Sequence, residues 1–152
     1  MQDLFLSLIL LSFTVFFVPD KTKYFITFIL LSAGIALTSI LAVMSIGKNG
    51  ILLTVPFLSG LSEYGFSLSV DGLSAFFLLV VNFTSLTGFI YAYKYLEPYK
   101  KVKYGLSFSI HYFSYIWLYF SMVLALMLRD GKAFIIVWEI MAFSSFMLVI
   151  FN

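Results

Sequence analysis

Apolar residues run along this chain in long blocks that are separated by short polar clusters. The blocks cover residues 4–18, 24–46, 72–95, 106–128 and 133–152. An α-helix needs roughly 20 residues to cross the hydrocarbon layer of a membrane, and most of the blocks have about that length. The pattern predicts an all-α integral membrane protein, with residues 1–152 forming a single membrane domain of five transmembrane helices.

The first block is the weakest of the five. Its residues rise only ~22 Å as a helix, so they must use Gln2 and Pro19 at the edges or thin the bilayer locally. A cleaved signal peptide is the alternative interpretation. A signal peptide begins with positive charge, whereas this chain begins with Met1, Gln2 and Asp3. We therefore expect the block to be retained.

Composition supports a membrane location and excludes several kinds of metal and redox site. Residues are 62% hydrophobic and only 11% charged, too little polar surface for a soluble globule. Cysteine is absent, which excludes disulfides, thiolate metal sites and iron-sulfur clusters held by this chain alone. The only histidine has no companion at metal-ligand spacing. We expect no cofactor, no metal and no bond chemistry here, and the small positive charge favours lipid headgroups over nucleic acid.

The basic residues predict an orientation, because lysine and arginine are retained on the cytoplasmic side. Lys21 and Lys23 lie between the first and second blocks, and Lys94, Lys100, Lys101 and Lys103 lie at or after the end of the third block. The opposite connections hold only Lys48, Arg129 and Lys132. We therefore expect an extracytoplasmic N-terminus in a multi-pass protein of the inner (plasma) membrane.

The connection between the second and third blocks is long and partly apolar. Phe66, Leu68 and Val70 alternate with serines, a period-two pattern typical of a short strand. Residues 51–57 could supply its partner across turn residues 59–65. The pattern predicts a small extracytoplasmic hairpin, and the alternative is an irregular apolar loop in the headgroups.

Two polar residues of the third block have structural interpretations. Asp71 directly precedes the block, where an aspartate commonly caps a helix N-terminus, and proton handling is the alternative. Asn82 lies mid-block with Ser85 on nearly the same face, and Thr84 and Gly88 form a small-residue pair. This arrangement predicts close helix contact and a side-chain hydrogen bond.

Glu139 is the leading candidate for a functional residue. It is the only charged residue between positions 133 and 152. Eleven Leu, Ile, Val and Phe residues there each favour insertion by ~0.3 to 0.6 kcal/mol, against roughly 3 for one charge. The block therefore inserts, and desolvation disfavours the ionised carboxylate unless a basic partner restores it. A carboxyl that can exchange a proton suits a relay, and a carboxyl permanently bonded to a neighbouring helix is the alternative.

His111 is a second candidate for proton transfer. It begins a polar-tipped row that continues through Ser114, Tyr115 and Tyr119 at helical spacing near the predicted cytoplasmic end. The row could hold water that feeds protons inward. It could equally be interfacial packing with a hydrated histidine.

Two long stretches resemble a known family. "SVDGLSAFFLLVVNFTSLTGFIYAYKYL" (69–96) and "FIIVWEIMAFSSFMLVIF" (134–151) resemble the antiporter-like membrane subunits of respiratory complex I, Mrp cation/proton antiporters and group 4 hydrogenases. "HYFSYIWLYFSMVLALMLRDG" (111–131) is most similar to the hydrogenase-type (hydrogenase-4) branch. The likeness covers the five expected helices, about the first third of such a subunit. Its most specific element is the pair Trp138 and Glu139.

The resemblance implies a role for Glu139 as the carboxylate of a proton path, paired with lysines on later helices, and a structural role for Asp71. We expect this chain to be the N-terminal part of a proton-translocating subunit in a membrane-bound oxidoreductase complex. Its expected partners are the other membrane subunits, including a chain or segment that supplies the later helices. A scaffolding subunit or truncated fragment that transports no ions is the alternative, and a small transporter that oligomerises is a third.

Overall fold

Four long helices dominate the computed structural model, which describes residues 2–46, 51–55, 66–101 and 105–151. They are α2 (Asp20–Ile46), α3 (Gly72–Tyr95), α4 (Gly105–Met127) and α5 (Gly131–Ile150). Each is long and apolar enough to cross a membrane. The chain is therefore a helical, multi-pass membrane protein, as its hydrophobic pattern predicts.

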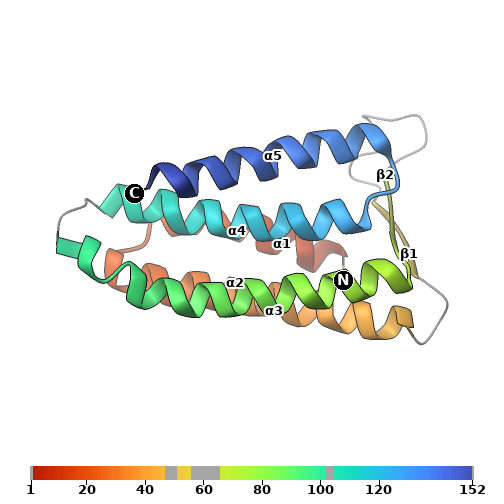
Figure 1. Ribbon diagram of the computed structural model, residues 1–152, viewed down its shortest axis with the longest axis horizontal. Coiled ribbons are helices and arrows are strands. Elements are labelled where there is room, and N and C mark those ends of the chain that lie inside the picture. Colours follow the sequence, from red (N-terminus) through yellow and green to blue (C-terminus); the bar gives the residue numbers. More distant parts are fainter. Residues whose placement is uncertain (1, 47–50, 56–65, 102–104, 152) are drawn as a thin grey trace.

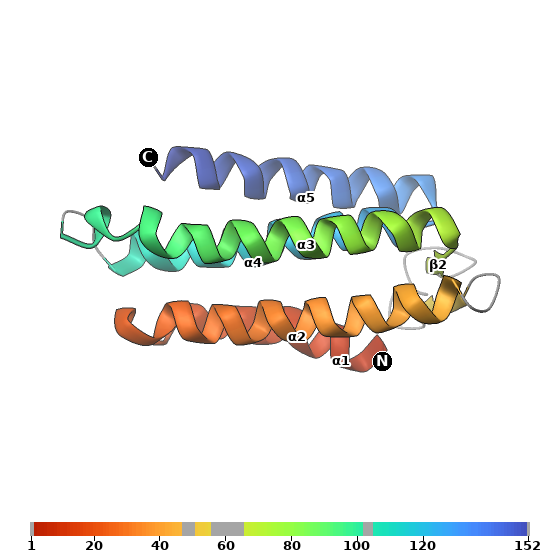
Figure 2. The same cartoon turned by 60° about the horizontal axis from the view of Figure 1, so that its bottom comes forward.

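The long helices run side by side along the longest dimension of the molecule (Figure 1). After rotation they separate into layers, with α5 on one outer side, α3 and α4 in the middle, and α2 with the N-terminal helix on the other side (Figure 2). The strongest helix pairings are α4 with α5, α2 with α3, and α2 with α4. The interior of the bundle is thus enclosed by α2, α3 and α4, while α5 packs mainly on α4.

The first apolar block forms a short broken helix. It consists of α1 (Gln2–Leu11) and the 3-10 helix η1 (Ser12–Phe16), and it is shorter than the four candidate spans. Trp117 on α4 fixes the break, because its indole Nε1 donates a hydrogen bond to Ser12 Oγ at 3.1 Å. Phe13 and Phe16 pack against the ring of Phe113 on α4, with centroids 5.1 and 5.0 Å apart. This segment is held to the bundle as a side element, and its length does not establish a fifth crossing.

A two-stranded hairpin closes one end of the bundle. Strands β1 (Ile51–Val55) and β2 (Phe66–Val70) pair antiparallel, with Ile51 opposite Val70. The predicted strand pairing is confirmed and the irregular-loop alternative is wrong, although the predicted turn residues 59–65 lie outside the described residues. Val70 is fully buried, and its carbonyl accepts a hydrogen bond from Ser45 Oγ near the end of α2. The hairpin therefore packs onto the helix ends (Figure 1).

Aspartates cap the N-termini of α3 and α5. Asp71 accepts a hydrogen bond from the backbone N–H of Ser74 at 2.7 Å, which confirms the predicted cap and holds the pKa of this carboxyl below its ordinary value of 3.8. Asp130 accepts from the backbone N–H groups of Lys132 and Ala133 at 2.8 and 3.0 Å. Each cap satisfies helix donors that would otherwise lack partners and fixes where the apolar helix begins.

Candidate functional site

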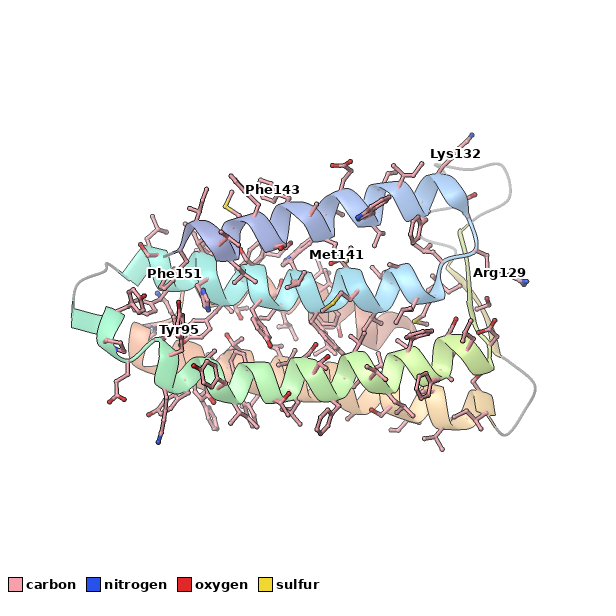
Figure 3. The ribbon with its side chains drawn as sticks, viewed as in Figure 1. Tyr95, Arg129, Lys132, Met141, Phe143 and Phe151 are labelled. Atoms are coloured by element: carbon pink, nitrogen blue, oxygen red, sulfur yellow. The ribbon has the colours of Figure 1, made fainter. Side chains whose placement is uncertain are left out.

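Glu139 lies near the middle of α5. It is eight residues after Gly131, about 12 Å along a helix of roughly 30 Å. Its side chain is exposed, as are those of Lys132, Ile135, Ala142, Phe143 and Phe146, which share its face. Figure 3 shows Lys132 and Phe143 projecting from α5 away from the other helices. The structure thus places the carboxyl on the outward face, away from the interior of this chain's bundle.

No hydrogen bond or ion pair to Glu139 is found within the part of the chain that the structure describes. Lys132 is on the same face but seven residues away, about 10 Å along the helix axis. The opposite face of α5 makes the contact with α4 and contains the buried residues Ala133 and Ser144. Any counter-charge close to Glu139 must therefore approach from outside these helices.

His111 is buried and lies far from Glu139. Its side chain is 8% exposed, and its ring centroid lies 4.5 Å from that of Phe151, just after α5 ends. Phe151 follows Glu139 by twelve residues, which corresponds to about 18 Å along a helix. The two residues predicted to take part in proton transfer are therefore not brought together, and His111 is not exposed at a hydrated surface of the bundle.

The row that follows His111 on α4 points into the bundle. Ser114 and Tyr119 are buried, and the Tyr115 hydroxyl donates to the backbone carbonyl of Ser85 at 2.7 Å. Tyr119 donates to Asn82 Oδ1 at 2.9 Å. These hydroxyls bond directly to α3, so the row acts as part of the helix packing.

A buried polar cluster joins α2, α3 and α4. We call the side chains of Thr38, Ser39, Asn82 and Tyr119 the polar cluster. Asn82 Oδ1 lies 2.9 Å from the Tyr119 hydroxyl and 3.1 Å from Thr38 Oγ1, and these two hydroxyls are 2.9 Å apart. Asn82 Nδ2 donates to Ser39 Oγ at 2.9 Å. The predicted side-chain hydrogen bond of Asn82 is confirmed, with partners on two other helices.

Glycines let these helices approach closely at two positions. A Cβ atom at Gly34 would lie 3.1 Å from the Tyr119 ring and 3.3 Å from that of Phe120. At Gly88 a Cβ would lie 2.9 Å from the Tyr115 hydroxyl. Thr84 is exposed and bonds only to carbonyls of its own helix. Of the predicted small-residue pair, Gly88 therefore lies at a close helix contact within this chain, whereas the described contacts of α3 near Thr84 pass through Asn82 and Ser85.

Lys23 is a buried cation that sequence reasoning treated as an ordinary flanking charge. It is only 4% exposed, and its Nζ donates to the backbone carbonyl of Gly105, the first residue of α4, at 2.9 Å. Nothing in the sequence separates it from neighbouring lysines except its position on the face of α2 that also carries Thr27, Leu31 and Thr38. Lys23 thus joins the beginnings of α2 and α4.

Neither the described residues nor similarity to known proteins adds a further site. The described residues contain no group of three or more His, Asp or Glu side chains placed to hold a metal ion. No protein-family model matches the chain, and no curated protein matches it significantly. The most distinctive candidate site is therefore the Glu139 carboxyl on α5, a helix long and apolar enough to cross a membrane.

Proposed function

We propose that this chain is the N-terminal part of a proton-translocating membrane subunit of an oxidoreductase complex, similar to the antiporter-like subunits of NADH:quinone oxidoreductase or hydrogenase-4. Glu139 is its proton-relay carboxylate. The observation that carries the proposal is a carboxyl halfway along a membrane-spanning helix, on a face that the described chain leaves without a polar partner. Charged groups at such depth are costly and are associated with ion pathways.

The outward face of α5 supports a partner on that side. A relay carboxyl requires a group that exchanges the proton and a counter-charge that adjusts proton affinity. The described helices bring neither close to Glu139, so both must come from helices that pack on α5. We propose that another membrane subunit or a further segment provides them, with a basic residue at the depth of Glu139.

The proposal includes a topology. We place the N-terminus and the β1–β2 hairpin on the extracytoplasmic side, with α1 and η1 as a fifth, short crossing in the inner membrane. The excess of lysine in the connection from α3 to α4 supports this orientation. The short first helix requires local thinning of the bilayer.

The decisive test is proton uptake by vesicles that contain the chain together with the helices proposed to pack on α5. Glu139→Gln removes the exchangeable proton while preserving size, and we expect it to abolish uptake. Glu97→Gln is the matched control, because the same chemical change falls at an exposed position after α3 ends, and it should leave uptake unchanged. Equal uptake by the native chain and Glu139→Gln would refute the relay.

A scaffolding role is the second candidate, and the polar cluster favours it. A bundle fixed internally by hydrogen bonds and apolar on its outside can brace neighbouring subunits without transporting ions. In that case Glu139→Gln leaves pumping intact, whereas bulky replacements of Ala142 on the outward face of α5 prevent assembly. Co-purification of neighbouring subunits with the Ala142→Phe variant measures this directly.

A further inference from the structure

The polar cluster and Glu139 lie at the same level of the bundle. A small apolar pocket between α1, α4 and α5 is lined by Ile9, Trp117, Phe120, Ser121, Leu124, Val137 and Ile140. Glu139 lies between the two α5 residues in sequence, and Tyr119 directly precedes Phe120. The part of α4 that supports the Glu139 turn of α5 is therefore the part whose other side carries Tyr119.

The position of α5 depends on that of α4. Within the described chain α5 packs mainly on α4, and most of its remaining surface is exposed. Only residues 128–130 separate the end of α4 from the start of α5, so the two helices are also joined by a short connection. A displacement of α4 along or around its axis would therefore be followed by α5 and its carboxyl.

The polar cluster specifies where α4 sits against α2 and α3. The Tyr119 hydroxyl bonds to α3 through Asn82 and contacts α2 through Thr38, while the rings of Tyr119 and Phe120 close over Gly34. Sliding α4 by one residue, about 1.5 Å, would break these hydrogen bonds where water cannot replace them. Apolar contacts alone would not distinguish the two registers as sharply.

We propose that Asn82 and Tyr119 are positioning residues, which hold α4 at one depth and one rotation and through it hold Glu139 at one depth. This inference rests on the proposed function of Glu139 for its chemical consequence, but the positioning itself is measurable without proton transport. Neither residue contacts Glu139, so their effect passes entirely through the packing of α5 on α4.

Spin-label distances test the positioning in the intact chain. Because the chain has no cysteine, labels at Leu73→Cys on α3 and Ile136→Cys on α5 report one distance; both positions are exposed. We expect Asn82→Leu and the conservative Tyr119→Phe to shift or broaden that distance by at least ~1.5 Å, one helical rise. Thr84→Val and Tyr91→Phe are the matched controls at exposed positions and should leave it unchanged. Distributions for Asn82→Leu and Tyr119→Phe that superimpose on the native one would overturn the proposal.

Infrared titration measures the protonation midpoint of Glu139, which would not change if the polar cluster only stabilised the bundle. The carboxyl band of Glu139 is identified by its loss in Glu139→Gln, and its protonation midpoint is followed with pH. We expect the midpoint to differ between the native chain and folded Tyr119→Phe, because the depth of the carboxyl has changed. An identical midpoint would show that the cluster does not position Glu139. Failure of the relay would instead appear as unaffected proton uptake in Glu139→Gln, with the label distances still responding.

Discussion

At the scale of single residues, the most informative atom is the Tyr119 hydroxyl. Its ring is almost fully buried, and the hydroxyl reaches both Asn82 and Thr38. Hydrogen bonds between membrane helices average ~0.6 kcal/mol and reach ~1.7. One side chain therefore contributes to the joining of three helices.

Tyr119→Phe removes this hydroxyl and retains the ring. We expect a loss of about 1 kcal/mol in the free energy of unfolding, because Asn82 Oδ1 loses one of its two hydroxyl partners. Thermal or denaturant unfolding in detergent micelles measures the change. Tyr91→Phe, at an exposed position of α3, should be neutral, and an equal effect of both substitutions would contradict the assignment.

Gly34 matters because of the space that it leaves. Any side chain there meets the Tyr119 and Phe120 rings at 3.1 and 3.3 Å from its first carbon. We expect Gly34→Val to destabilise the bundle by about 1–3 kcal/mol through overpacking. Gly72→Val is the comparison, since no atom lies within 4 Å of a Cβ at that position. Unfolding of the two variants side by side distinguishes crowding from the general effect of replacing glycine.

At the scale of elements, the cap of α3 predicts a pH dependence. The Ser74 N–H lowers the pKa of Asp71 below 3.8, so the folded state favours the ionised form. The stabilisation is present above the unfolded-state pKa and is lost as pH falls through the lower folded value. Below about pH 4 we expect weaker amide protection in the first turn of α3, after correction for the intrinsic pH dependence of exchange. An asparagine can cap the helix but has no carboxyl to titrate. Amide protection in the first turn of α3 should therefore lack this acid-dependent loss in the Asp71→Asn variant.

The elements themselves were largely predictable, for identifiable reasons. Long apolar blocks specify α2 to α5, the alternation at residues 66–70 specifies a strand, and an aspartate before a helical block specifies the cap at Asp71. The Asp130 cap has a comparable sequence signal, an aspartate directly before the block that forms α5. The first block, the shortest of the five, is also the one that forms no helix of spanning length.

The orientation of helix faces was not predictable. Lipid and protein interior are both apolar, so hydrophobic periodicity does not distinguish the inward face of α5 from its outward face. The partners of Asn82 lie 44 and 37 positions away, at Thr38 and Tyr119, and no local pattern connects them. In sequence Lys23 does not differ from the other flanking lysines, because its burial depends on the placement of α4.

At the scale of the whole molecule, the two ends of the bundle should face opposite compartments. The hairpin closes one end, and the connection from α3 to α4 through η3 (Pro98–Lys101) lies at the other. Single cysteines at Ser69 and Glu97 should react with an impermeant maleimide from the extracytoplasmic and cytoplasmic sides, respectively. Labelling of both from one side would contradict the proposed topology.

The one-sided support of α5 also determines how the helix can move. A helix gripped along a single line resists sliding more than it resists turning about that line, because turning exchanges one hydrocarbon-facing surface for another. The rotational orientation of the Glu139 carboxyl about α5 therefore changes more easily than its depth in the bilayer. The partner subunit proposed to pack on α5 would then need only to select one rotational orientation of this carboxyl.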